Sequence, residues 1–159
     1  GHEPLQNVRI RFNLDVVGGS VGSLCEAYRE IARSDEAGLW VNLLFDHETP
    51  EVKVESPYTG PALRISPKRP GPLFVRIPPW VAPQDMDIQG VQGTPRHTNG
   101  YLFIPEPEVN RTITLGYPLR EQEVTLRHRT REVRVRLRGD EVIAMENFGA
   151  DLTFFDALE

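Results

Sequence analysis

Prolines and glycines divide the sequence after residue 38 into short segments, and this division limits that region to strands and turns. Proline interrupts a helix because it lacks an amide hydrogen and clashes with the preceding turn. The chain contains 14 prolines and 13 glycines among 159 residues, and turns recur at intervals of about 8 to 12 residues, as in a sandwich. The pattern predicts a mainly β protein: an antiparallel, jelly-roll-like β-sandwich preceded by one α-helix.

The predicted strands cover most of the sequence after residue 38. They are residues 39–45, 52–54, 63–65, 73–77, 86–89, 101–104, 112–115, 124–128, 133–138, 142–145 and 152–155. Apolar and polar residues alternate in most of them, as expected for strands with one buried face. We expect the alternating apolar residues of 39–45, 73–77 and 133–137 to fill the core.

Arginines alternate with apolar residues in the segment 133–138. A tight turn at Gly139-Asp140 would pair Arg138 with Glu141 across a hairpin, so that opposite charges face each other. A solvent-exposed charged face is the favoured interpretation, and a surface for an anionic ligand is the alternative.

One helix is predicted, at residues 23–35. Leu24, Tyr28 and Ile31 recur at helical spacing, and Ser23 stands at the capping position before them. Gly38 could adopt the left-handed conformation just past the end.

The glycine-rich segment 14–28, which reads LDVVGGSVGSLCEAY, precedes and enters this helix. A strand, a glycine-rich turn and a helix start could bind a phosphate, but Ser20 replaces a required glycine and no alternating strands and helices follow. An elbow that joins two structural units is therefore favoured. Cys25, a lone cysteine among apolar residues, is expected to be buried and unreactive.

Charge and composition exclude several classes of function. A net charge of -5 argues against nucleic-acid binding, and no apolar run approaches the ~18 to 20 residues of a membrane helix. The single cysteine excludes an internal disulfide. His47 and Glu48 would point to opposite faces of a strand, and His97 and His128 lie in unrelated segments, so we expect no metal and no cofactor.

Four aromatic residues are the candidates for carbohydrate binding: Trp40, Tyr58, Trp80 and Tyr101. Their rings could stack on the apolar faces of sugars. Packing in the core is the favoured role for them. No residue is assigned a catalytic role.

The order of several segments resembles the C-terminal part of the β-L-arabinofuranosidase-type glycoside hydrolases and their uncharacterised relatives. The segments are GLWVNLLF (38–45), VRIPPW (75–80), MDIQG (86–90), GYLFI (100–104) and TITLGYPL (112–119). In that family an α/α toroidal barrel carries the active site, and β-sandwich domains follow it. The resemblance implies that residues 1–38 are a strand, elbow and helix left from an upstream helical barrel, and that residues 39–159 form the sandwich domain.

One departure from the family concerns catalysis. The characterised enzymes have a cysteine pair just before the equivalent helix, which supplies a zinc-bound nucleophile. The corresponding residues 13–19 read NLDVVGG, and Cys25 lies about two helical turns too late. The resemblance therefore implies a non-catalytic module of a larger, bacterial, carbohydrate-active protein, whose partners are the barrel and plant or bacterial glycans. An independent protein-interaction or ligand-binding sandwich is the alternative.

The helix distinguishes these two hypotheses. A helix taken from a barrel should leave Leu24, Tyr28 and Ile31 partly uncovered, and two copies could then bury these faces in a weak homodimer. An independent domain should bury them. Gly1-His2 resembles the remnant of a cleaved tag, so we expect the natural start to lie further upstream.

Overall fold

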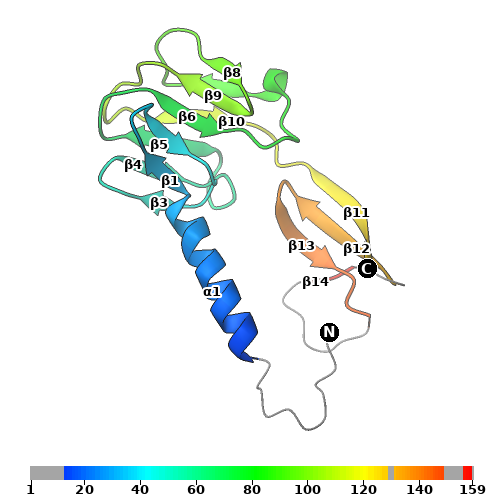
Figure 1. The fold of residues 1–159 in the computed structure, drawn as a ribbon. Coiled ribbons are helices and arrows are strands. Elements are labelled where there is room, and N and C mark those ends of the chain that lie inside the picture. Colours follow the sequence, from blue (N-terminus) through cyan, green and yellow to red (C-terminus); the bar gives the residue numbers. More distant parts are fainter. Residues whose placement is uncertain (1–12, 129–130, 149–155, 159) are drawn as a thin grey trace.

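The computed structural model describes residues 13–128, 131–148 and 156–158, which form one α-helix, a short 3-10 helix and three β-sheets (Figure 1). The elements are α1 (Asn13–Arg29), β1 (Ala32–Ser34), β2 (Leu39–Val41), β3 (His47–Glu48), β4 (Val52–Glu55), β5 (Leu63–Pro67), β6 (Leu73–Arg76), η1 (Pro83–Asp85), β7 (Asp87–Gln89), β8 (Arg96–Thr98), β9 (Tyr101–Ile104), β10 (Ile113–Gly116), β11 (Glu121–His128), β12 (Arg131–Arg138), β13 (Glu141–Met145) and β14 (Asp156–Ala157). The predicted strand at 152–155 lies outside the described residues.

Two five-stranded sheets pack face to face and form the sandwich. The first has the order β1-β2-β6-β9-β8, and the second has the order β3-β4-β5-β10-β7. Alternation along each strand sends every second side chain inward. The buried apolar residues of both sheets make one core: Leu39, Val41, Val52, Val54, Leu63, Ile65, Leu73, Val75, Leu102, Ile104, Ile113 and Leu115, with Ile77 and Val81 beside them. The predicted fold class, a β-sandwich preceded by a helix, is confirmed.

Most strand pairs are antiparallel, as predicted, but two of the pairs in the described residues are parallel. β2 pairs with β6 in the sandwich, where Trp40 lies opposite Phe74, and β13 pairs with β14. Alternation in a single strand cannot reveal the direction of its neighbour, so these parallel pairs could not be predicted from the sequence.

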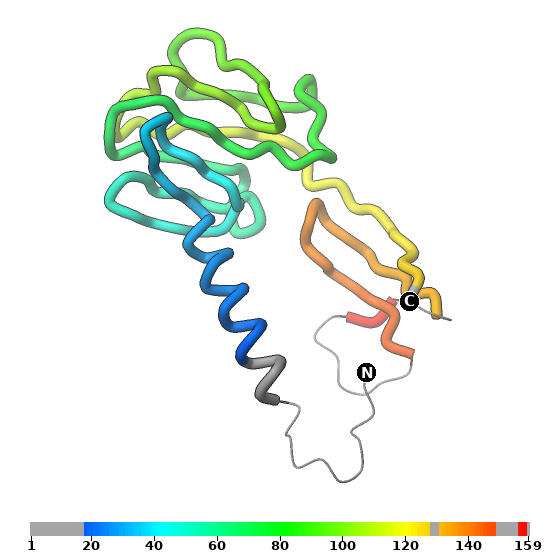
Figure 2. The backbone as a smooth tube through the Cα atoms, in the orientation of Figure 1, coloured from blue at the N-terminus to red at the C-terminus, as the bar shows by residue number. Residues whose placement is uncertain are grey.

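The strands β11 to β14 form a third sheet beside the sandwich, as the tube in Figure 2 shows. The prediction that residues 133–137 fill the sandwich core is therefore wrong. The hairpin prediction is confirmed, because Arg138 pairs with Glu141 across the turn, and their side chains form an ion pair of 2.6 Å. Arg134 likewise contacts Glu146 at 2.9 Å, which raises the pKa of the guanidinium. These pairs support the interpretation of a solvent-exposed charged face.

Helix α1 begins earlier and ends earlier than predicted. It runs through Gly18, Gly19 and Gly22, so the predicted elbow is wrong, and the Ser23 hydroxyl donates to the Gly19 carbonyl inside the helix at 3.0 Å rather than capping its start. An interior glycine costs a helix only about 0.5–1 kcal/mol relative to alanine, which weakens it without ending it. The helix ends at Arg29 because residues 32–34 pair with β2 instead.

Gly38 lies in the turn between β1 and β2 and not at a helix end. Its φ of 145° suits glycine, and a Cβ at this position would overlap the Pro72 carbonyl oxygen. The backbone amide of Leu39 donates to that same oxygen at 2.8 Å. The close approach of two backbones therefore explains this glycine.

Helix α1 projects from the sandwich and is anchored at its C-terminal end (Figure 1). Ile31, just past the helix, is 4% exposed, and its carbonyl accepts hydrogen bonds from the amides of Asn42 and Leu43. In contrast, Leu24 is 69% and Tyr28 63% exposed. The described part of the chain contains no helix that is both long and apolar enough to cross a membrane.

The glycines of α1 give a test of its continuity. A Cβ added at Gly19 or Gly22 would meet nothing within 4 Å, so alanine should stabilise the helix by about 0.5–1 kcal/mol at each position. We expect Gly19→Ala with Gly22→Ala to increase the circular dichroism signal at 222 nm and to leave the fold intact. A loss of helical signal would indicate that these glycines form a turn.

Candidate functional site

A groove of about 800 Å³ lies between the sandwich and the turn of the β12–β13 hairpin. This volume is typical of small-molecule sites. Its walls come from the segment after β2, the loop after β4, the end of β6 and the hairpin turn. They are formed by Asn42, Leu43, Leu44, Phe45, Asp46, Ser56, Tyr58, Thr59, Arg76, Pro78, Pro79, Asp140 and Glu141.

The hairpin turn is held against the sandwich by two hydrogen bonds, which we call the Asp140 contact. The indole nitrogen of Trp80 donates to the Asp140 carboxylate at 2.6 Å, and the Asp140 amide donates to the Tyr58 hydroxyl at 2.8 Å. Gly139, with a φ of 61°, lets the backbone approach closely, because a Cβ there would lie 2.7 Å from the Tyr58 hydroxyl oxygen and 2.9 Å from the Trp80 ring. The contact fixes one wall of the groove.

Tyr117 lies behind this wall. Its ring meets the Trp80 ring edge to face with centroids 5.8 Å apart, and its buried hydroxyl has no hydrogen-bond partner among the described residues. Burial raises the pKa of Tyr117 and, more weakly, the pKa of Tyr58. Both phenols therefore stay protonated at neutral pH.

The opposite wall is fixed by polar contacts from the first sheet and from the loop after β4. The Tyr101 hydroxyl donates to the Asn42 side-chain oxygen at 2.9 Å. Asp46 accepts from the Ser56 amide at 2.6 Å and from the Thr59 hydroxyl at 2.8 Å. The Ser56 amide is the main cause that lowers the pKa of Asp46.

A row of aromatic side chains, Trp40, Phe74 and Phe103, crosses the outer face of the first sheet. The Trp40 and Phe74 rings stack with centroids 3.9 Å apart and planes 9° apart, and Phe103 follows at 5.0 Å. The Arg33 guanidinium lies 5.6 Å from the Trp40 ring centroid. Since Phe74 and Arg33 both pack against the Trp40 ring, a sugar could stack on that ring only by displacing one of them.

The four predicted sugar-binding aromatics therefore lie in two places. Tyr58 lines the groove, whereas Trp80 and Tyr101 hold lining residues in position from behind. Trp40 belongs to the aromatic row and contacts the Tyr101 ring edge to face at 5.3 Å. They do not form one stacking platform.

Of the residues that line the groove, sequence reasoning had selected Tyr58 alone, and the missed ones include Asn42, Phe45 and Arg76. Phe45 ends the apolar run 38–45, and alternation predicted it to be buried, but it is 58% exposed. Asn42 and Arg76 come from segments that meet only because β2 pairs with β6. No local pattern signals that pairing.

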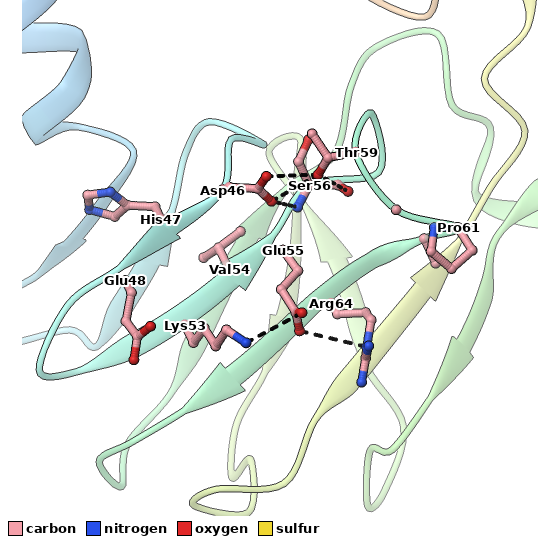
Figure 3. Close-up of a pocket in the computed structure, with 12 residues that line it drawn as sticks. Asp46, His47, Glu48, Lys53, Val54, Glu55, Ser56, Thr59, Pro61 and Arg64 are labelled. Atoms are coloured by element: carbon pink, nitrogen blue, oxygen red, sulfur yellow. Dashed lines mark hydrogen bonds and ion pairs between the residues drawn. The ribbon is translucent and has the colours of Figure 1, made fainter.

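A second pocket of about 610 Å³ lies on the outer face of the second sheet, next to the groove (Figure 3). Its charged side chains neutralise one another: Glu55 contacts both Lys53 at 3.4 Å and Arg64 at 3.8 Å, as the dashed lines in the figure show. Asp46, which lines both pockets, is occupied by Ser56 and Thr59. This pocket is the weaker candidate because only Val54, Pro61 and Ala62 among its lining residues have apolar side chains.

The described residues contain no group of three histidine, cysteine or acidic side chains that could hold a metal ion. Residues 13–19, where the resemblance implies a zinc-binding cysteine pair, contain no thiol and form part of α1. Cys25 is exposed on the helix, so the prediction that it is buried is wrong. The side chains of residues 13–19 therefore do not fit the zinc centre that the resemblance implies.

Comparison with solved structures shows a similarity in fold. No protein-family model and no curated protein matches the chain. Among solved structures, the chain is similar to a GH127 β-L-arabinofuranosidase from Geobacillus stearothermophilus T6, with a TM-score of 0.51 and 23% identity. The similarity covers 82% of this chain and 22% of that chain. At this identity, the comparison shows a fold shared with part of the enzyme.

Gly139 and Gly93 give a matched test of the Asp140 contact. Both have positive φ, 61° and 78°, but a Cβ at Gly93 would meet nothing within 4 Å. Alanine should cost about 1–2 kcal/mol at either position from backbone strain alone. We expect Gly139→Ala to cost about 1–3 kcal/mol more in thermal unfolding, because it also forces Trp80 and Tyr58 apart. Equal losses in the two variants would refute the role of the contact.

Proposed function

We propose that the chain is a non-catalytic β-sandwich module of a larger carbohydrate-active protein, a glycoside hydrolase, and that α1 docks it onto a helical domain. The exposed apolar side of α1 carries this proposal. The fold shared with part of an arabinofuranosidase supports the assignment to a carbohydrate-active protein. In this proposal residues 1–38 belong with the helical barrel and residues 39–159 form the module, although β1 already pairs with β2.

The docking surface is a stripe of Val21, Leu24 and Tyr28, which we call the helix stripe. These residues are spaced at i, i+3 and i+7, so they lie on one side of the helix, and all three are exposed. Covering a large apolar side chain contributes on the order of 1.5 to 3 kcal/mol. A helical partner with an apolar groove would satisfy this stripe.

The alternative, an independent interaction or ligand-binding domain, makes the opposite prediction for this helix. It expects Leu24, Tyr28 and Ile31 to be buried within the chain. Ile31 is buried, but Leu24 and Tyr28 are exposed, although the Tyr28 ring meets the His47 ring edge to face with centroids 5.1 Å apart. The exposure favours a helix that packs against a further domain.

One substitution tests docking in two contexts. In the protein encoded by the complete gene, Leu24→Glu should lower the free energy of unfolding by about 2 kcal/mol, because it places a charge in a packed interface. In the present chain the same substitution should change little, because Leu24 is exposed. Thermal unfolding of the four proteins measures both effects. The same small effect in both contexts would favour the independent domain.

We also propose that the chain by itself forms a weak homodimer through the helix stripe. Ile31 has helical spacing with these residues but is buried, so Leu24 and Tyr28 would make the contact, with Val21 beside them. We expect light scattering to show a mass that rises with concentration, and Leu24→Glu to remain monomeric. Glu26→Gln on the same helix is the control, which should still associate. A monomer at every concentration contradicts the dimer but leaves docking open.

A further inference from the structure

We propose that the groove beside the Asp140 contact binds a neutral oligosaccharide. The proposal rests on the groove itself and would stand even if α1 docked elsewhere.

The apolar wall is the first argument. Leu43, Leu44, Phe45, Tyr58, Pro78 and Pro79 line the groove. Phe45 leaves 58% of its surface exposed beside them, and the flat Tyr58 ring and proline faces continue the same wall. An apolar wall with aromatic members matches the C–H face of a sugar ring.

The state of the carboxylates is the second argument. Asp46, Asp140 and Glu141 line the groove, and each already has a partner within the chain: the Ser56 amide, the Trp80 indole and the Arg138 guanidinium. These partners leave further acceptor sites, such as the Asp140 oxygen that the indole does not contact, free to accept hydrogen bonds from sugar hydroxyls. Three carboxylates line the groove against the guanidinium of Arg76, and even when Arg138, which pairs with Glu141, is counted, negative charges outnumber positive ones. This excess disfavours phosphates and acidic sugars. The charges of the groove therefore favour a neutral ligand.

The free hydrogen-bonding groups are the third argument. Arg76 is exposed and has no ion pair or hydrogen bond among the described residues. The Tyr101 hydroxyl donates a hydrogen bond to the side-chain oxygen of Asn42. The side-chain amide nitrogen of Asn42 has no partner among the described residues. A planar guanidinium and a planar amide beside an apolar wall suit vicinal hydroxyls at the edge of a sugar ring. Neutral sugars combine these two features, apolar faces and hydroxyl edges.

Both walls are held in place before any ligand arrives. The Asp140 contact fixes the hairpin side, and the Tyr101 hydroxyl fixes Asn42 on the other side. A preformed site loses less conformational entropy on binding, which permits measurable affinity for a small, weakly interacting ligand.

Titration of the isotope-labelled chain with arabinohexaose, xylohexaose and cellohexaose tests the proposal by NMR. We expect at least one of them to bind with a dissociation constant of about 1 mM and to shift the amide signals of Asn42, Phe45, Tyr58 and Arg76. Galacturonic acid trimer is the anionic probe, and it should bind at least about tenfold more weakly.

Variants locate the binding surface. Phe45→Ala and Arg76→Ala should each weaken binding about five- to tenfold, and both replace exposed side chains, so the amide spectrum should stay native. Arg96→Ala is the matched control. Arg96 is an exposed arginine in β8 of the first sheet, which also contains Arg76, and it lies opposite Phe103. It should bind like the parent.

Three outcomes would overturn the proposal. The first is no shift with any neutral oligosaccharide up to about 10 mM, near the weak end of measurable affinity. The second is a loss of binding in Arg96→Ala but not in Phe45→Ala, which would place the ligand on the aromatic row. The third is tighter binding of the galacturonic acid trimer, which would show that the ligand is anionic. None of these outcomes alters the unfolding measurements on Leu24→Glu.

Discussion

The Asp140 contact is the interaction on which the arrangement of this molecule depends. The third sheet buries only Val135 and Ala144 among its apolar residues in the described part, so it has little core of its own to hold it in place. Just before β11, Arg120 forms an ion pair of 2.8 Å with Asp85, but the arginine is mostly exposed, and such pairs contribute little. The two hydrogen bonds that join Asp140 to Trp80 and Tyr58, together with the close packing of Gly139 against both rings, therefore keep the sheet beside the sandwich and shape the groove between them.

Local patterns predicted the strands well because alternation and turn residues act over a few positions. β9 was predicted at its observed bounds, and the pairing across Gly139-Asp140 followed from the turn. The same patterns do not say which sheet a strand joins. The segment 133–137 alternates as cleanly as β6 does, yet it lies in the third sheet. The helix was misplaced for a related reason: glycines lower its stability by small amounts, whereas the pairing of residues 32–34 with β2 decides where it ends.

The candidate site was predicted in residue type but not in place. Aromatic residues were selected for their chemistry, and Tyr58 does line the groove, but Trp80 and Tyr101 act on it only by holding Asp140 and Asn42. Phe45 was not predicted as a site residue, because an apolar residue at the end of an apolar run is normally buried. Its exposure depends on the chain leaving the sheet after β2, which follows from long-range packing and not from local sequence.

The two proposed surfaces are joined by one short segment. The Ile31 carbonyl, at the base of α1, accepts hydrogen bonds from the amides of Asn42 and Leu43 at 2.9 and 3.3 Å, and these two residues begin the wall of the groove. A domain that docks on the helix stripe would therefore be connected, through Ile31, to the segment that forms the wall of the groove. Because this connection is short, a displacement of α1 would act directly on Asn42, and the hydrogen bond from the Tyr101 hydroxyl to Asn42 opposes it. In a carbohydrate-active protein, this arrangement would place a bound oligosaccharide close to the interface with the helical domain.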